Sequence, residues 1–439
     1  MKKTKEKTDI WDVVVIGGGP AGLMSAGIAA KFGAKVLLIE KNDIMGKKLL
    51  LTGGGRCNLT NADPDQRNFV SKFGKKGNFL FTPLSIFGVD DSIRFFENLG
   101  LKTKVEPGYR VFPVSDNALD VLGVLTKYAM NNGVEFKLGV AVSHIKQAPS
   151  PRGGASGKID SIILADGEEI KGNNFVLATG GKSHPETGST GDGFKWLKEI
   201  GHKVIEPNPS LVPIKVRESW IAELAGITLE NVGISIWVLE KNTDKSEWKK
   251  IIGKKGKVLF THVGLSGPTI INMSKIIGDL LDQKKEIKVA IDFFPGVGLD
   301  IMHDKMIKLF EKNPKKKIKN LFLPEVPEKI YLKILEIMGM DGEWFANEIR
   351  RAERMSILEK FKMFKLTVDS LLGYDKSIVS SGGVDLNEVD FKEMKSKLYK
   401  NLFLVGDILD FDRNSGGYSL QLCWTSGYVA GKSAAKKLT

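Results

Sequence analysis

Residues 12–40, DVVVIGGGPAGLMSAGIAAKFGAKVLLIE, decide how the rest of the chain is interpreted. The apolar run 13–16 predicts a buried parallel strand. Gly17, Gly19 and Gly22 follow in the spacing G-x-G-x-x-G. One glycine permits a tight turn, one lets the backbone approach a pyrophosphate, and one lets a helix pack closely on the strand. A helix that begins near Pro20 points its positive end at the phosphates. The stretch therefore predicts a phosphate-binding turn.

A second apolar strand, 35–39, ends on Glu40. At this position a carboxylate can accept hydrogen bonds from both hydroxyls of an adenosine ribose. An ordinary glycine turn in an α/β unit does not explain that acid. The whole stretch therefore predicts a dinucleotide site, with candidate contacts at Gly17, Gly19, Pro20, Ala21, Gly22, Glu40 and Lys41.

Composition bounds the class of protein. The chain has 439 residues, enough for two or three domains, and 42% hydrophobic with 27% charged residues is typical of a soluble globular protein. No apolar run approaches the length of a bilayer span, so we expect no membrane partner. The basic N-terminus runs into the first strand without a cleavable apolar region, which predicts a cytoplasmic protein.

The net charge of +13 raises the possibility of nucleic-acid binding. Against it, only ten of the 65 basic residues are Arg, and the lysines are spread along the chain. Nucleic acid is therefore not the favoured partner. Cys57 and Cys423 are the only cysteines, and without a C-x-x-C motif a flavin-linked disulfide reductase is disfavoured. The five histidines show no metal-ligand spacing, so no metal site is predicted.

A second glycine-rich segment, MGKKLLLTGGGRCNLTN, covers residues 45–61. Three glycines followed by an arginine predict a loop that wraps an anion with backbone N–H groups and a guanidinium. The alternative is a flexible surface loop. Candidate cofactor contacts here are Gly55, Arg56, Cys57 and Asn58. Cys57 is either a thiolate beside Arg56 or a small buried packing residue.

Later segments predict a return of the chain to the same cofactor. A buried strand in 174–181, NFVLATGG, ends in small residues, which makes Thr179 and Gly180 candidates. Another, 401–407 (NLFLVGD), ends in Gly406 and Asp407, and that carboxylate can hold a ribitol hydroxyl. A final helix begins after Gly416 and Gly417, within RNSGGYSLQ (413–421), and its N-terminus at Gly417 and Tyr418 would face a flavin pyrimidine ring.

The sequence pattern changes in the middle of the chain. Strand-like runs at 211–216, 233–239, 257–261 and 287–294 precede a Lys-rich helical pattern at 299–364. The predicted fold class is α/β: a Rossmann-like FAD-binding domain interrupted by an inserted β-barrel-like and helical unit. The expected divisions are 1–195 and 366–439 for the two parts of the FAD-binding domain, 196–298 for the β-barrel-like unit, and 299–365 for the helical unit.

These pieces resemble the BaiN-like NAD(P)/FAD-dependent oxidoreductase family, which includes aminoacetone oxidase. The matching motifs are GGGPAG (17–22), TGGGRCNLTN (52–61), ATGG (178–181), GSTGDG (188–193), PSLVPI (209–214), FTHVGLSGP (260–268), SGGV (381–384) and GGYSLQ (416–421). The resemblance implies an FAD domain of the glutathione-reductase type with an insertion. Asp407 departs from the family, whose members usually carry Glu there; either acid can reach a hydroxyl.

The resemblance implies hydride transfer at flavin N5 on a small or steroid-like ketone or enone, or on an aminoketone. No second G-x-G-x-x-G follows Gly181, so no separate NAD domain is expected. Either NAD(P)H visits the flavin transiently or O2 reoxidises it. His262 and Ser266 are candidate substrate-side catalytic residues, although His262 could equally be a core histidine at a strand end. The alternatives are an FAD-dependent tRNA-modifying enzyme and a flavin-binding interaction protein without activity.

Overall fold

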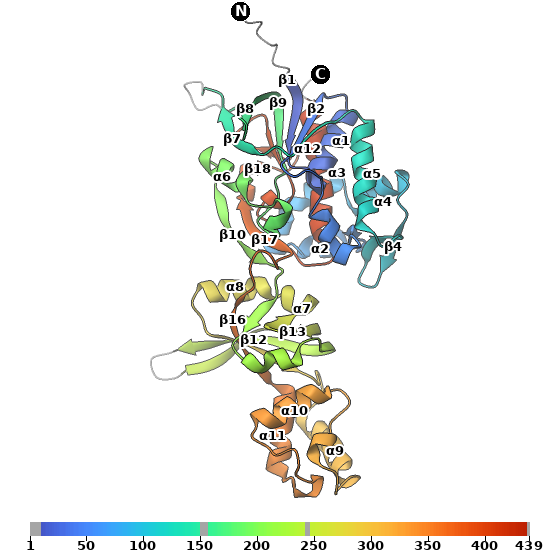
Figure 1. Cartoon of the computed structure of the whole chain (residues 1–439), viewed down its shortest axis with the longest axis vertical. Coiled ribbons are helices and arrows are strands. Elements are labelled where there is room, and N and C mark those ends of the chain that lie inside the picture. Colours follow the sequence, from blue (N-terminus) through green and yellow to red (C-terminus); the bar gives the residue numbers. More distant parts are fainter. Residues whose placement is uncertain (1–9, 150–156, 242–245, 437–439) are drawn as a thin grey trace, which may run out of the picture. The chain divides into compact units, whose positions relative to one another are not determined.

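The computed structural model describes residues 10–149, 157–241 and 246–436. The chain forms two compact units, which Figure 1 draws in one ribbon. The first contains the chain up to Pro209 and again from Tyr374, and the second contains Ser210–Gly373. A Rossmann-type unit interrupted by a β-barrel is therefore confirmed. The sequence divisions at 195/196 and 365/366 lie 14 and 8 residues before the limits of the second unit, and the predicted domain bounds, including the division of the insertion, stay predictions.

The first unit is built on a mixed sheet in the order β18-β19-β20-β9-β1-β2-β6, in which the pairs from β20 to β6 are parallel. β8 also pairs with β9, and β7 with β8, both antiparallel. β1 pairs in parallel with β2 on one side and with β9 on the other, and β20 extends the sheet beyond β9. Val13, Val14 and Val15 at its centre are fully buried, as continuous apolar runs in parallel strands require. The strands of this unit are β1 (Ile10–Ile16), β2 (Val36–Glu40), β3 (Thr60–Asn61), β4 (Thr103–Glu106), β5 (Arg110–Pro113), β6 (Glu135–Leu138), β7 (Val142–Gln147), β8 (Ile159–Leu164), β9 (Glu169–Leu177), β10 (Val204–Ser210), β17 (Val379–Val384), β18 (Val389–Asp390), β19 (Lys395–Ser396) and β20 (Leu402–Leu404).

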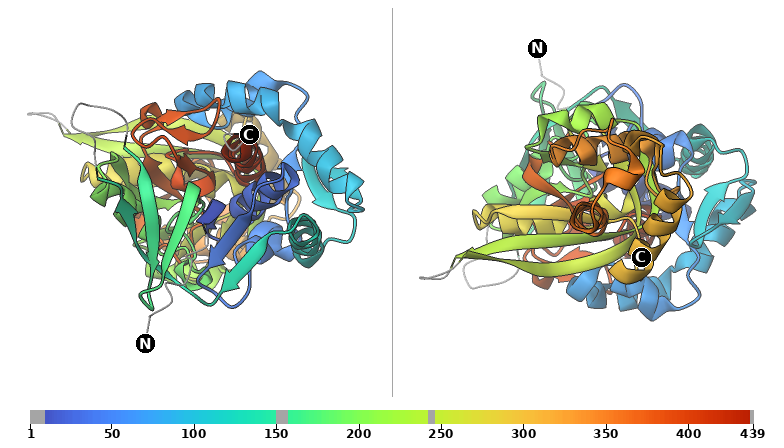
Figure 2. Two further views of the ribbon diagram at one scale, coloured as in Figure 1. Left: turned by 90° about the horizontal axis from the view of Figure 1, so that it is seen from above. Right: turned by 90° about the horizontal axis from the view of Figure 1, so that it is seen from below.

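Two helices from opposite ends of the sequence pack on this sheet. α1 and α12 lie side by side, as the left view of Figure 2 shows in blue and dark red. Glycines make this approach possible, because a Cβ on Gly427 would lie 2.6 Å from the carbonyl oxygen of Ala21. The Ser25 hydroxyl donates to the Gly427 carbonyl at 3.0 Å. The helices of this unit are α1 (Pro20–Lys31), α2 (Gln66–Ser71), α3 (Phe81–Ile86), α4 (Val89–Asn98), α5 (Ala118–Asn131), α6 (Asp192–Glu199) and α12 (Tyr418–Ala435).

The second unit is a closed barrel in the order β11-β14-β13-β12-β15-β16. Helices α7 and α8 lie between β14 and β15 in the chain, and α9, α10 and α11 lie between β15 and β16. The predicted strands 233–239 and 257–261 are parts of a long hairpin, β12–β13, whose far end runs out from the barrel (Figure 2, right). Its elements are β11 (Ile214–Val216), β12 (Thr228–Lys241), β13 (Ser246–Phe260), β14 (Gly264–Ser266), β15 (Ile287–Asp292), β16 (Phe364–Leu371), α7 (Pro268–Ile271), α8 (Ser274–Asp282), α9 (Leu299–Glu311), α10 (Glu328–Ile337) and α11 (Arg351–Lys362).

Candidate cofactor-binding site

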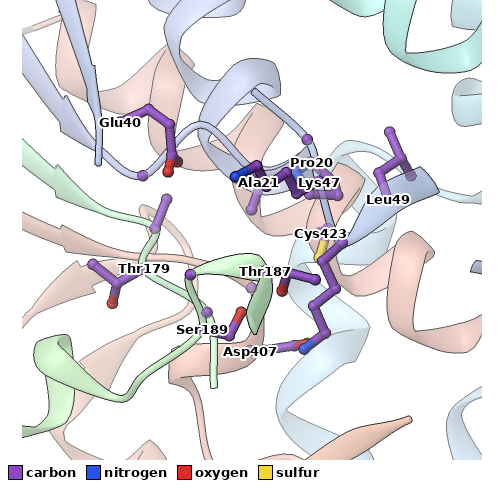
Figure 3. A pocket seen from close by; sticks show the side chains of 18 of the residues that line it. Pro20, Ala21, Glu40, Lys47, Leu49, Thr179, Thr187, Ser189, Asp407 and Cys423 are labelled. Carbon is purple, nitrogen blue, oxygen red and sulfur yellow. The ribbon is translucent and has the colours of Figure 1, made fainter. Parts of the chain in front are cut away.

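A deep cleft opens in the first unit where β1, β2 and β9 end (Figure 3). Carboxyl ends of parallel strands are where α/β sheets bind their ligands. The cleft holds about 1200 Å³ of space, including its open mouth. The predicted contacts that line it are Gly17, Gly19, Pro20, Ala21, Glu40, Lys41, Thr179, Gly180, Gly406 and Asp407.

The glycine turn after β1 has the geometry that a diphosphate requires. Gly17 has φ of +107°, and a Cβ there would lie 2.5 Å from the Ala178 carbonyl oxygen. A Cβ on Gly22 would lie 1.9 Å from the Gly17 carbonyl oxygen, so α1 packs against the turn only because residue 22 is glycine. At Gly19 a Cβ would meet nothing within 4 Å, so this side of the turn is open to the cleft. The backbone can therefore approach a phosphate closely.

The N-terminus of α1 adds a positive end to this turn. Gly19 is its N-cap, no side chain caps the helix, and no acidic residue occupies its first turn. The first backbone N–H groups and the helix dipole therefore remain available to an anion.

Glu40 ends β2 at the rim of the cleft. One carboxylate oxygen accepts from the Gly18 N–H at 2.7 Å, and the other accepts from the backbone and side-chain N–H groups of Asn42 at 2.9 and 2.7 Å. These bonds fix the carboxylate beside the glycine turn. Its neighbour Lys41 pairs with Asp192 at 2.7 Å, which ties β2 to the start of α6. That Glu40 binds a ribose stays a prediction.

Thr179 follows β9 and has an unused hydroxyl. Its Oγ1 is buried and has no hydrogen-bond partner within the described part of the chain. Burying a hydroxyl without a hydrogen-bond partner costs free energy. A hydrogen bond from Thr179 to a polar atom of a ligand would remove this cost. Gly180 beside it has φ of +73° and also lines the cleft.

Asp407 and the start of α12 form the wall of the cleft away from Glu40; Figure 3 labels both acids. The Asp407 carboxylate accepts from the Arg413 guanidinium. Gly417 is the N-cap of α12 with φ of +101°, and the residues of α12 that reach the cleft are Ser419, Leu420 and Cys423. Gly417 and the buried Tyr418 lie outside its lining, and burial raises the pKa of Tyr418 to about 12. Their contact with the cofactor stays a prediction.

The 52–58 segment presents less to the cleft than its composition indicates, because only Thr52 lines it. The Arg56 guanidinium binds Glu106 and Asp116 and lies 4.1 Å from the Phe112 ring centroid, so its charge is already balanced. This arrangement gives no support to the predicted role of Arg56 in holding an anion, which remains untested.

Its neighbours Gly55, Cys57 and Asn58 also lie outside the cleft lining. Burial raises the pKa of Cys57 to about 12, so it is a thiol in its packing role. With its amide suitably oriented, Asn58 accepts from the Gly417 N–H at 3.1 Å, which links this segment to α12. Contact of these three residues with the cofactor stays a prediction.

His262 and Ser266 belong to the second unit. His262 is exposed in the turn between β13 and β14, where the Thr261 N–H donates to the Gly264 carbonyl at 2.8 Å, and Ser266 ends β14. An exposed His262 is not a core histidine. Whether either residue contacts a substrate stays a prediction.

Several residues of the cleft were missed by sequence reasoning. Asn42, Lys47, Lys48, Ser189 and Trp196 line it beside the predicted contacts. The available signal for the two lysines is their place in the glycine-rich segment 45–61. In residues 10–149, 157–241 and 246–436 no cluster of His, Cys, Asp and Glu could hold a metal ion. Within the same ranges, no helix has the length and apolar character that crossing a bilayer requires.

The open glycine turn, the uncapped helix start and the unpartnered Thr179 hydroxyl fit a dinucleotide cofactor. On a Rossmann-type unit interrupted by a β-barrel, they define the class: the protein is an FAD-dependent oxidoreductase. Its family can be stated as well. The chain belongs to the family described as HI0933-like protein Rossmann domain, whose model matches residues 11–433.

Two relatives align with nearly the whole chain. The 3-dehydro-bile acid delta(4,6)-reductase of Clostridium scindens is 31% identical over 96% of this chain and 98% of its own length. The ribosomal RNA dihydrouridine synthase of Haemophilus influenzae is 26% identical over 97% of this chain and 98% of its own. Among solved structures, the open conformation of a flavocytochrome c3 fumarate reductase has a TM-score of 0.52 at 17% identity, covering 98% of this chain and 78% of that one. This last likeness concerns the fold alone.

Proposed function

We propose that the protein reduces a carbon–carbon double bond conjugated to a carbonyl group in a steroid-like or smaller enone, with NAD(P)H as electron donor. The observation that carries this proposal is the similarity to the bile-acid delta(4,6)-reductase, at 31% identity over 96% of the chain. FAD, when bound, supplies hydride transfer at its N5 atom.

The chemistry common to the two relatives supports the reaction type. By their names, one reduces ring double bonds of a 3-oxo bile acid and the other reduces uridine to dihydrouridine. In both substrates the double bond is conjugated to a carbonyl group, so hydride adds to the β-carbon and a proton adds to the α-carbon. An enzyme descended from the same ancestor is expected to keep this step even where its substrate differs.

The residues of the first unit are suited to holding the cofactor for that step. Gly17, Gly19 and the start of α1 would bind the diphosphate, Glu40 the adenosine ribose, and Asp407 a ribitol hydroxyl. The sequence offers no second G-x-G-x-x-G, so the nicotinamide donor would bind transiently rather than in a domain of its own. His262 and Ser266 are the proposed substrate-side groups.

Anaerobic spectroscopy of the holoprotein tests the proposal. We expect NADH or NADPH to bleach the flavin absorbance, and a 3-oxo-Δ4 steroid to restore it with formation of the saturated ketone. If NAD(P)H bleaches the flavin and neither the steroid nor a smaller enone restores its absorbance, the enone assignment is wrong. Free FAD without protein, at the same flavin concentration, is the control for reaction of unbound flavin.

A second candidate, reduction of uridine in RNA, is favoured by the dihydrouridine synthase relative and by the net charge of +13. β13 carries five exposed lysines, of which Lys249 and Lys257 pair with glutamates. Binding of ribosomal RNA that weakens steeply with salt, together with dihydrouridine formation, would support this candidate over the first. Peroxide formed from an aminoketone in air would instead indicate an oxidase.

A further inference from the structure

Lys48 is a cationic side chain in the wall of the cleft. It directly precedes the turn Leu49–Gly55, and its side chain is 22% exposed. Its Nζ donates to the hydroxyl of Ser183, which is fully buried, and lies 3.7 Å from an oxygen of Asp407. Ser183 donates in turn to the Ile378 carbonyl at 3.3 Å. The lysine head is therefore held in place at the Asp407 wall.

The carboxylate beside Lys48 already has a partner. The Arg413 side chain is 1% exposed, and its guanidinium donates to Asp407, to the Phe411 carbonyl at 2.9 Å and to the Ser419 hydroxyl at 2.8 Å. Two cations thus share one carboxylate in a poorly hydrated place. The N-terminus of α12 adds positive potential from the same wall.

The balance of charges leaves this wall positive. Loss of hydration lowers the pKa of Lys48, and the nearby Asp407 charge opposes that effect. A cation held where water is scarce is stabilised when an additional negative charge arrives nearby. Reduction of the flavin is the process that changes the charge of the cofactor. Two electrons and one proton, taken from a reductant and from solvent, make the flavin ring one unit more negative.

We propose that Lys48 is a positioning residue that compensates this charge and makes the bound flavin easier to reduce. The start of α12, which is expected to face the ring, belongs to the same wall as Lys48, because Arg413 joins Ser419 to Asp407. The phosphates are expected at the glycine turn and the start of α1, which also meets this wall, since a Cβ on Gly406 would lie 3.0 Å from the Ala21 Cβ. The midpoint potential separates the two roles, because only the ring changes its charge on reduction. The inference rests on FAD as the cofactor and is independent of the proposed substrate.

Lys47 provides a matched control. It is the neighbouring residue, lines the same cleft and carries the same charge. Its Nζ donates to the side-chain oxygen of Asn42 at 3.2 Å, and Asn42 is bonded to Glu40. Lys47 therefore belongs to the ribose side of the cleft, where flavin reduction changes no charge.

The experiment measures the two-electron midpoint potential of the flavin in holoprotein, by anaerobic equilibration with a reference dye. Lys48→Met should weaken binding of the reduced relative to the oxidised cofactor by tenfold or more, which is a fall of about 30 mV for a two-electron couple. Lys48→Arg should stay near the wild-type potential because the charge remains. Lys47→Met should leave the potential unchanged. Flavin content, read from absorbance, is recorded for every variant.

An unchanged potential in Lys48→Met would overturn the proposal, whatever happened to flavin content, because Lys48 would then have only a structural role. An equal fall in Lys47→Met would also overturn it, since any cleft cation would suffice. If Lys48→Met fails to fold with FAD, Asp407→Asn decides: removing the negative charge should raise the potential, and a potential that stays level or falls refutes the assignment. No substrate enters these measurements, so their failure leaves the enone proposal untouched.

Discussion

The substitution Gly22→Ala tests whether the glycine turn has been interpreted correctly. The added Cβ would lie 1.9 Å from the Gly17 carbonyl oxygen and 3.2 Å from the Ala178 Cβ. The first contact is with backbone, so no side-chain rotation relieves it, and α1 must move away from β1. Overpacking of this kind costs up to about 3 kcal/mol. Alanine recovers about 1 kcal/mol of helix propensity, leaving a net loss near 2 kcal/mol.

Gly123→Ala is the matched control, because Gly123 also lies within a helix, α5, and a Cβ there meets nothing within 4 Å. It should raise the free energy of unfolding by about 0.5–1 kcal/mol. Urea unfolding of apoprotein measures both changes, and fluorescence titration measures FAD affinity, which should fall at least tenfold in Gly22→Ala alone. If Gly22→Ala kept wild-type stability and affinity, the close packing of α1 on the turn would not be required for the site.

Three further predictions concern single side chains. Glu40→Ala should weaken FAD binding by about 1–3 kcal/mol, measured by flavin loss on dialysis; full retention would exclude Glu40 as the ribose ligand. His202 is buried between Glu388 and Ser396, and loss of hydration lowers its pKa below the ordinary 6.5. The unfolded chain then binds a proton that the folded chain does not. The free energy of unfolding should fall as pH drops below about 6.5, and His202→Asn should show less of this slope in urea titrations. His262→Ala should keep its flavin but lose turnover in steady-state assays, and unchanged turnover would remove His262 from the substrate side.

Sequence reasoning located the parts of the fold whose signals are local. The strand, the glycine turn and the strand ending in Glu40 lie within 29 consecutive residues, and the structure has them as β1, the turn and β2. Strand ends in the insertion were less predictable, because exposed lysines along β13 hide its length.

The site was only partly predictable for a related reason. Glu40 ends the apolar strand β2, and Asp407 follows the apolar strand β20 by three residues. Both patterns are local, and both acids line the cleft. The only local signal for Lys48 is its place in the glycine-rich segment 45–61, and its importance depends on Ser183 and Asp407, which are distant in sequence. Arg56 is the opposite case, a residue with a local signal that was misleading. Its place after three glycines predicted that it binds an anion of the cofactor, but in the structure it pairs with Glu106 and Asp116.

The pairing of α1 with α12 has a consequence for synthesis of the protein. The bond from Ser25 to Gly427 joins residues 402 positions apart, and β20, which extends the central sheet, is also made near the end. A ribosome adds roughly 5–20 residues per second, so a nascent chain waits on the order of a minute with its glycine turn made and one wall of the cleft missing. The inserted barrel can fold during that wait, but cofactor loading must follow synthesis of α12. We therefore expect premature termination before α12 to yield protein that never acquires flavin.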